Sequence, residues 1–440
     1  MRPARGYWSH ILRAIFLMAI LIGAPTLAGS KTSGFGNTVA QPSKPNHVMD
    51  LSQDSRWQVY LNDYGYPTDD PNLQLQPDLA TFNSVSFLSE KVLVTTFLTR
   101  RSPIALQRHN DPNHQVPFHL HAFFLDASNG KVLKTLEWPL ESAHAGIFPS
   151  GDGGFVFFST EGFERYSANL LRERTLPLPQ LKATGVGQYG LAAAPSGRGL
   201  LLVYEVKNAI QCVWVDSATL STTESACTIP GRFTISDDET AAAVTPDQKN
   251  RDWRVIIGGK SEPWHELCDD KKMQDCRIPT FVAEKTIVVS NQYGFSVLDD
   301  VGGIQLHEKY KFLDFWIEPD SGPVRSSAIG NRFAVILNHL PYKISNAQGG
   351  LVIVSGEVHF HSVLDLRRVP GPLPGRLDVY DLSSQTWFVS LLNKQDKFKE
   401  IFGFALSPSG INLAVDTGGV IHMYVLPMDA NEGNEPIKIH

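Results

Sequence analysis

The chain has 440 residues, of which 45 are Asp or Glu and 39 are Lys or Arg, so its formal net charge at pH 7 is −6. A chain with this balance lacks the basic footprint that binds the phosphate backbone, which excludes nucleic acid as the expected partner. Hydrophobic residues make up 42% of the sequence, and a chain of this length and composition can bury a large core.

Residues 1–28 have the features of a secretory signal peptide. Three arginines precede a short apolar run, AIFLMAILIGAPTLA, and the small residues Thr26 and Ala28 place the expected cleavage after Ala28. The run is shorter than the roughly 20 apolar residues of a membrane-spanning helix, so we expect no transmembrane segment after cleavage. An uncleaved N-terminal anchor is the alternative. Cleavage removes the three arginines and changes the net charge from −6 to −9. The expected location is secreted or periplasmic.

Residues 29–55 are rich in Gly, Ser, Pro and Asn, so we expect a disordered linker there, and residues 428–440 are expected to be a flexible tail for the same reason. Between them, residues 56–63 (RWQVYLND) form a lone stretch of alternating polar and apolar residues, with Trp57, Val59 and Leu61 on one face. A chain that begins at Asp54 keeps this stretch and loses only residues of the expected linker. We therefore expect it to be as stable as the mature protein.

Residues 56–427 consist of short β-strand patterns with turn residues at nearly every boundary. The strands group in fours, and the unit returns seven times, although the last unit has only three strands of its own. Repetition with four strands per unit is typical of a β-propeller, so we predict an all-β, seven-bladed β-propeller of four-stranded antiparallel blades. The stretch 56–63 is predicted to supply the missing outermost strand of the last blade. A two-sheet sandwich is the alternative.

A recurring turn supports the propeller over the sandwich. It appears as DASNG, DSATL, DDVGG and DLSSQ, between the third and fourth strands of a unit. Asp at the start of such a turn accepts backbone N–H groups, and Gly near its end can take a positive φ. Together with LSPSGINLAVDTGGVIHMYVLP, these turns resemble the exported bacterial WD40-like and YVTN-type β-propellers over residues 78–427. That resemblance implies a rigid disc used as a binding platform. The Gly-His and Trp-Asp dipeptides of true WD40 repeats are missing.

Four cysteines in an exported chain are expected to form two disulfides. Cys212 lies in a strand pattern and Cys227 follows the next turn, so a hairpin would bring the two side by side. Cys268 and Cys276 lie on either side of a polar loop. We therefore predict the pairs Cys212–Cys227 and Cys268–Cys276 over the two other pairings.

Histidines are the most suggestive polar residues. His119 and His121 form one H-x-H pair and His359 and His361 form another, and residues two apart on a strand share a face, so each pair is a possible half of a metal site. The alternative is that His119 and His121 are the outward side of an amphipathic strand. We favour the alternative, and we assign no metal, cofactor or catalytic residue.

Two long insertions fall at equivalent places, between the second and third strands of blades one and six. The first contains His109 and His114, and the second contains His339 and Tyr342. Equivalent loops of a propeller emerge on the same rim, and only blade seven separates these two blades. Long loops are often functional, so these four residues mark the candidate binding rim.

The leading functional hypothesis is an exported, non-catalytic binding platform for a protein, peptide or glycan, acting as a monomer through the rim near blades one, seven and six. One alternative is a propeller enzyme, either a metal-dependent lactonase-like hydrolase or a quinone-dependent dehydrogenase. The innermost strand patterns and their turns hold only five scattered ionisable residues and no histidine, which weighs against an enzyme: Glu90, Arg232, Asp237, Asp238 and Glu284. The second alternative is a structural component of the cell envelope.

Overall fold

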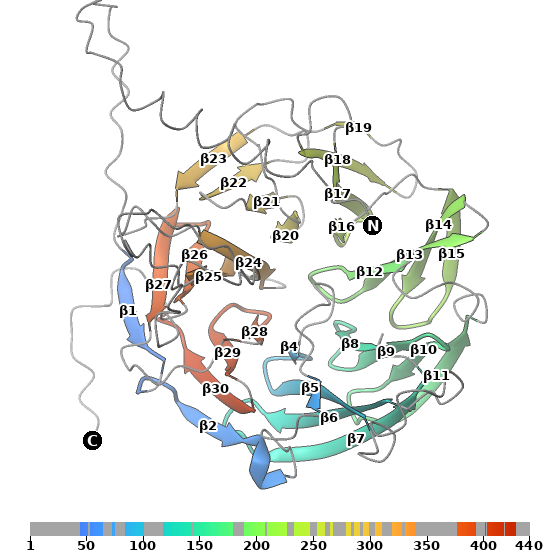
Figure 1. The fold of residues 1–440 in the computed structure, drawn as a ribbon, viewed down its shortest axis with the longest axis horizontal. Coiled ribbons are helices and arrows are strands. Elements are labelled where there is room, and N and C mark those ends of the chain that lie inside the picture. Colours follow the sequence, from blue (N-terminus) through green and yellow to red (C-terminus); the bar gives the residue numbers. More distant parts are fainter. Residues whose placement is uncertain are drawn as a thin grey trace, which may run out of the picture. The chain divides into compact units, whose positions relative to one another are not determined.

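The protein, as a computed structural model, is a seven-bladed β-propeller with almost no helix (Figure 1). The chain divides into two units, residues 1–41 and 42–440, and every described residue belongs to the second. No helix within the described ranges is long and apolar enough to cross a membrane. The structure describes residues 45–51, 53–64, 73–74, 84–100, 118–141, 145–178, 189–206, 209–226, 233–246, 253–259, 265–266, 279–282, 286–290, 294–298, 304–309, 319–327, 331–339, 376–392, 401, 403–417 and 419–427.

The first four blades follow one another in chain order, each with its innermost strand first. Blade one consists of β4 (Val85–Phe87), β5 (Val92–Arg100), β6 (Phe118–Asp126) and β7 (Val132–Leu140), and the short β3 (Leu73–Gln74) pairs with the far end of β5. Blade two consists of β8 (Gly146–Pro149), β9 (Phe155–Ser159), β10 (Gly162–Tyr166) and β11 (Arg172–Pro177). Blade three consists of β12 (Tyr189–Ala193), β13 (Gly199–Val206), β14 (Ala209–Asp216) and β15 (Thr222–Ala226). Blade four consists of β16 (Phe233–Ile235), β17 (Thr240–Pro246), β18 (Trp253–Gly259) and β19 (His265–Glu266).

The last three blades include the strands that close the ring. Blade five consists of β20 (Thr280–Val282), β21 (Thr286–Ser290), β22 (Gly294–Leu298) and β23 (Ile304–Lys309). Blade six consists of β24 (Pro319–Ser326), β25 (Arg332–His339), β26 (Arg376–Asp381) and β27 (Thr386–Leu392), with β1 (His47–Asp50) added outside β27. Blade seven consists of β28 (Gly403–Leu406), β29 (Asn412–Asp416), β30 (Val420–Val425) and β2 (Trp57–Tyr60), and β2 leads into the 3-10 turn η1 (Leu61–Tyr64).

The core is divided among the seams, the interfaces between adjacent blades. Each of the seven seams holds one cluster of buried apolar side chains drawn from the two blades that meet there. Blade seven packs against blade six through Leu413 and Tyr424, and against blade one through Ala414 and Met423. Because strand side chains alternate between faces, each blade needs two neighbours to cover both faces, which explains the repetition in the sequence.

The N-terminal strand closes blade seven, as the sequence predicts. β2 pairs antiparallel with β30, with Trp57 opposite Met423 and Tyr60 opposite Val420. Val59 is buried with the core of the seam to blade one, and the Trp57 indole N–H donates to the Ala127 carbonyl at 3.0 Å. A strand from near the start of the described chain and its last strand, β30, therefore lie in one sheet.

The prediction of a disordered linker over residues 29–55 is wrong for the C-terminal part of this segment, which the structure describes. Residues 47–50 form β1, which pairs parallel with β27 so that His47 lies opposite Val389. Met49 packs against the seam between blades six and seven, where Leu51 is buried and its carbonyl accepts a hydrogen bond from the Tyr424 hydroxyl. The gain from burying these two side chains is what orders a segment that composition alone assigns to a linker. Residues 1–44 and 428–440 lie outside the described ranges.

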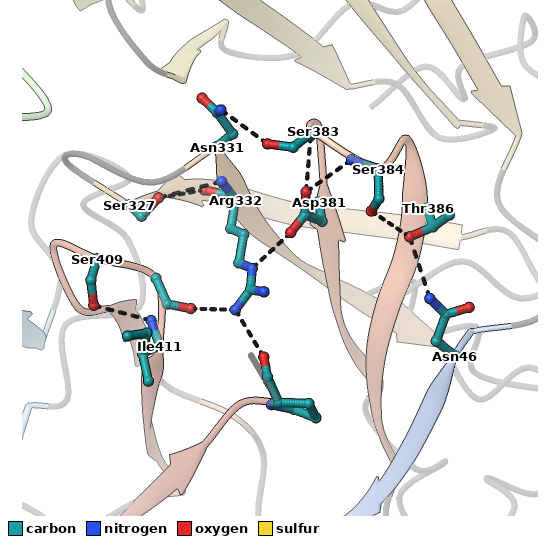
Figure 2. A network of polar contacts seen from close by, with 12 residues as sticks. Asn46, Ser327, Asn331, Arg332, Asp381, Ser383, Ser384, Thr386, Ser409 and Ile411 are labelled. Carbon is teal, nitrogen blue, oxygen red and sulfur yellow. Dashed lines mark hydrogen bonds and ion pairs between the residues drawn. The ribbon is translucent and has the colours of Figure 1, made fainter. Parts of the chain in front are cut away.

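A buried arginine joins blades six and seven (Figure 2). The Arg332 Nε–H donates to the Asp381 carboxylate at 2.9 Å within blade six, and its guanidinium lies 4.1 Å from the Phe388 ring centre. The same guanidinium donates to the carbonyls of Gly410 and Pro427 in blade seven, at 3.1 and 3.3 Å. Arginine's planar set of donors suits a site where one side chain must meet several acceptors.

The predicted Asp turns are present in blades one, three and six. In each, the Asp carboxylate accepts backbone N–H groups, as Asp216 does from Thr219 at 2.7 Å. In blade one the hydrogen bond from the Ser128 hydroxyl holds the pKa of Asp126 below its ordinary value. Gly130 takes the positive φ in that turn, but Leu220 and Gln385 take it in the other two. Leu220 is buried in the seam between blades two and three, and that burial offsets the backbone strain.

Candidate binding rim

The insertion rim is the edge of the propeller at which the second strand of each blade meets the third. In blade one it lies where Arg100 of β5 is opposite Phe118 of β6, and in blade six where Leu337 of β25 is opposite Arg376 of β26. The innermost strands of blades six, seven and one are neighbours in the order β24, β28, β4. Both predicted insertions therefore depart from one rim of adjacent blades, although residues 101–117 and 340–375 themselves lie outside the described ranges.

A cluster of three side chains lies at the insertion-rim end of blade one. His119 and His121 of β6 face Glu137 of β7, and the register places His121 opposite Glu137. The distance from His119 Nδ1 to Glu137 Oε1 is 2.7 Å, and from His121 Nδ1 to Glu137 Oε2 it is 3.5 Å. The shorter contact lacks the alignment of a hydrogen bond, and it is an ion pair only when the imidazole is protonated. We call these three residues the His-Glu cluster.

The cluster is the end of a row of aromatic rings. His121 stacks on Phe97 of β5 with centroids 4.8 Å apart and an interplanar angle of 14°. Phe97 lies 5.8 Å from Phe123, and Phe123 meets the edge of Tyr64 in η1 at 6.1 Å. Tyr64 is 48% exposed, whereas the two phenylalanines are buried. The row therefore leads from an exposed tyrosine beside blade seven, across buried rings, to the half-exposed cluster of blade one.

The histidines are half-buried rather than fully outward-facing. The His119 and His121 side chains are 12% and 23% exposed, and Leu120 between them is fully buried on the opposite face of the blade. The predicted alternation is therefore correct, but the histidine face is partly covered, because a blade of a propeller has a neighbour on each side. Partial burial fixes the rings while leaving them accessible from the rim.

Blade seven contributes polar residues to the same rim. Asp416 ends β29, is buried, and accepts hydrogen bonds from the Gly419 backbone at 3.1 Å and from the Ser84 hydroxyl of blade one at 3.2 Å. His422 of β30 lies within 3.1 Å of the Thr417 hydroxyl, and burial lowers the pKa of its imidazole from 6.5 to about 4. His422 is thus a neutral core histidine at neutral pH.

Two carboxylates in turns that follow innermost strands hold neighbouring blades together. Asp237 of blade four accepts from the Ser196 backbone of blade three at 3.1 Å, and Glu90 of blade one accepts from the Ser409 backbone of blade seven. These two groups are therefore engaged at blade junctions rather than gathered around the axis. Arg232 and Glu284 lie outside the described ranges.

The other predicted site residues have mixed outcomes. His339 is the last residue of β25, opposite Pro319, at the insertion rim. Cys212 is buried on β14 and disulfide-bonded, but β15 ends at Ala226, just before its predicted partner. Among the described residues, no three His, Cys, Asp or Glu side chains form a complete metal site. The remaining predicted residues lie outside the described ranges, so their roles stay predictions: His109, His114, Tyr342, Cys227, Cys268, Cys276, His359 and His361.

The sequence alone does not identify Glu137, Phe97 or Tyr64 as part of the site. The one signal for Glu137 is its place in the alternating stretch KTLEW of the strand after the histidines. Phe97 resembles any core residue of a strand, and Tyr64 follows the lone N-terminal strand pattern.

Comparison with known proteins assigns the chain to no family. No family model matches the chain, and no curated protein matches it. Among solved structures, the WD40 domain of Neurospora crassa Pan2 is 12% identical, covers 87% of this chain and 98% of that one, and has a TM-score of 0.48. A streptogramin B lyase is 12% identical, with coverage of 81% and 97% and a TM-score of 0.45. TolB from Acinetobacter baumannii is 9% identical, with coverage of 76% and 80% and a TM-score of 0.34. Because no family model matches, membership of the exported YVTN-type propellers stays a prediction.

Proposed function

We propose that this protein is an exported, non-catalytic binding platform that takes a protein, peptide or glycan on its insertion rim, near blades one, seven and six. The observation that carries the proposal is the aromatic row from Tyr64 to the His-Glu cluster. Its buried rings hold the polar groups at its rim end in fixed positions. Fixed polar groups beside exposed aromatic rings are what recognition surfaces use.

The ends of the row differ in chemistry, which favours an elongated ligand. Tyr64 offers an exposed ring that can stack on a sugar face or a peptide side chain, and the neighbouring Tyr60 is 54% exposed. Glu137, whose side chain is 38% exposed, offers a carboxylate. A ligand that contacts both ends spans the seam between blades seven and one. The expected location, secreted or periplasmic, rests on the N-terminal signal pattern.

The test uses the mature chain, beginning at Gly29, immobilised and probed with a displayed random-peptide library and a glycan array. We expect enrichment of one sequence motif or one glycan class. Tyr64→Ala and Glu137→Gln should each weaken that binding by about tenfold, the loss of one good contact of about 1.4 kcal/mol.

The matched control is Leu171→Ala. Leu171 is 61% exposed and lies in the turn between β10 and β11, on the opposite rim of blade two. Its substitution should leave binding unchanged. Ligands that bind equally well to the Tyr64 and Glu137 variants would contradict the proposed rim, and the absence of any enriched peptide or glycan would contradict the proposed function.

A further inference from the structure

The turn between β6 and β7 of blade one contains Asn129 followed by Gly130, the one Asn-Gly pair in the sequence. In such a pair the backbone nitrogen of the glycine can attack the carbonyl carbon of the asparagine side chain, and glycine has no side chain to obstruct this approach. The bond from that carbon to the amide nitrogen breaks, ammonia leaves and a cyclic imide remains. Water then opens the imide on one side or the other, which gives isoaspartate or aspartate.

The turn presents Asn129 to water and holds its side chain across the next residue. Asn129 is exposed, and its Oδ1 accepts the backbone N–H of Lys131 at 2.8 Å. Its Nδ2 donates to the Asp126 carboxylate at 3.2 Å, and the Gly130 N–H donates to the Asp126 carbonyl at 2.8 Å. These hydrogen bonds slow the reaction, because the attacking nitrogen and the leaving amide must both give up a partner.

We propose that Asn129 is a site of spontaneous deamidation, and that its conversion loosens β2, the N-terminal strand that closes blade seven. The inference is independent of the proposed function. It requires no reactant other than water, so it applies to the protein wherever it is kept.

The link from this turn to β2 is direct contact. A Cβ placed on Gly130 would lie 2.7 Å from Val59 Cγ2 and 2.8 Å from Trp57 Cε3, so the glycine is pressed against β2. The carbonyl of Ala127, in the same turn, accepts the Trp57 indole N–H at 3.0 Å. Isoaspartate lengthens the main chain by one carbon just before Gly130. Because no space separates this glycine from Trp57 and Val59, either the turn or β2 must move.

The aspartate product has a milder effect on the same turn. It replaces the Asn129 amide, which donates to the carboxylate of Asp126 and to the hydroxyl of Ser128 at 3.2 Å, by a second carboxylate. Two donated hydrogen bonds are lost and two like charges face each other. The groups are exposed, so water screens much of the repulsion.

Blade two supplies a matched control in the same molecule. Asn169 is also exposed and also precedes the residue with positive φ in the turn between the third and fourth strands, but that residue is Leu170, with φ 59°. The leucine side chain obstructs the attack that glycine permits. Asn169 should therefore outlast Asn129 in a turn of the same kind.

The first test needs no variant. The mature chain, beginning at Gly29, is kept folded at mildly alkaline pH, and samples taken over time are analysed by peptide mass spectrometry and hydrogen exchange. We expect Asn129 to convert before Asn169, and exchange in residues 56–63 to become faster as the converted fraction rises, with β13 of blade three unchanged. Conversion of Asn129 no faster than that of Asn169, or unchanged exchange in residues 56–63 of a converted sample, would overturn the proposal.

Variants then separate the chemical change from general ageing of the protein. Asn129→Asp installs the milder product directly and should lower the melting temperature by roughly 2 °C, whereas Asn169→Asp should leave it unchanged. Asn129→Gln should abolish the rise in exchange of residues 56–63, because glutamine would have to close a larger and slower-forming ring. A rise in this variant equal to that of the wild type would show that β2 loosens for another reason.

Discussion

The seam between blades one and two is filled with aromatic rings, whereas the seam between blades six and seven is joined by an arginine and by the N-terminal segment. In the first, Trp138 stacks on Phe157 at 4.5 Å and its indole N–H donates to the Tyr166 hydroxyl at 3.0 Å. In the second, Arg332 bonds to blade seven and Leu51 fills the core. Both seams lie between blades that follow one another in the chain. The second, which we call the closing seam, also receives strands from the N-terminal end of the chain.

The difference shows how a ring without a covalent closure is made stable. In both seams the short chain between consecutive blades holds them at high effective concentration. The closing blades combine packing with directional bonds and with strands from the distant end of the chain, which must all be lost together if the ring opens. The following predictions compare the two seams, from the largest expected effect to the smallest.

Truncation should have the largest effect. A chain that begins at Pro77 lacks β1, β2 and η1, and so loses the buried side chains of Leu51, Val59 and Leu61. At about 1.5–3 kcal/mol for each buried side chain, the loss approaches the whole stability of a typical domain, so we expect aggregation or no folded protein. Expression in soluble form and thermal melting are the measurements.

A chain that begins at Asp54 distinguishes the contribution of β1 to stability from that of β2. It keeps β2 but loses β1 and Leu51, so its melting temperature should fall between those of the mature protein and of the chain from Pro77. The sequence alone predicts no loss here. A melting temperature equal to that of the mature chain would show that β1 contributes nothing to closure.

Arg332→Met should cost about 3–5 kcal/mol of unfolding free energy, because it leaves the Asp381 carboxylate and two carbonyls of blade seven without their donor. Arg332→Lys should recover little of this, since an ammonium cannot reach all three acceptors. Urea unfolding gives the numbers.

Arg172→Met is the control from the other seam. Arg172 forms an exposed ion pair with Glu164 at 3.3 Å, and such pairs contribute about 0–1 kcal/mol. Similar losses for the two arginine variants would mean that the closing seam is not held by Arg332.

Acid should weaken the closing seam through His422, which stacks against Tyr424. Its folded-state pKa lies below the unfolded value, so the stability it provides is complete above about pH 6.5 and is lost as the pH falls toward about 4. The difference corresponds to about 3 kcal/mol. His422→Gln should flatten this part of the pH dependence, as measured by urea unfolding at several pH values. Parallel curves for the wild type and the variant would contradict the assignment.

Apart from the Arg172→Met control, Tyr166→Phe should have the smallest effect, about 1–2 kcal/mol. It keeps the ring that stacks on Phe155 at 4.6 Å and removes only the hydroxyl that bonds to Trp138 and to Glu164. Burial and the Glu164 hydrogen bond raise the pKa of Tyr166 to about 12, so the wild-type seam should lose stability only as the pH rises from 10 toward 12. A loss as large as that of Arg332→Met would remove the distinction between the seams.

The fold was predictable because its signals are local. Turn residues lie at the strand boundaries of every blade. The alternation of Trp57, Val59 and Leu61 predicts a strand that needs a partner. β1 gives no such signal. It has four residues, its pairing is parallel, and its partner strand lies at the other end of the chain, so nothing near it in the sequence indicates where it binds.

The site was only half predictable, for a reason visible in the register of blade one. The pairing of β6 with β7 shifts by one residue between Phe124 and Leu125. If the pairing is counted from the turn without that bulge, Glu137 lies opposite Leu120. It is then on the face of the blade away from the two histidines. The bulge moves it opposite His121 and creates the cluster. Composition and periodicity carry no information about such a shift.

The contact between Leu51 and Tyr424 joins residues 373 positions apart in the sequence. Pairings of such high contact order form slowly, because most of the chain must be organised before they gain anything. The N-terminal strands are synthesised first, yet their partners on blades six and seven are among the last residues made. Until then the edges of β27 and β30 are open to other chains. The molecule is therefore most prone to aggregation just before the ring is complete.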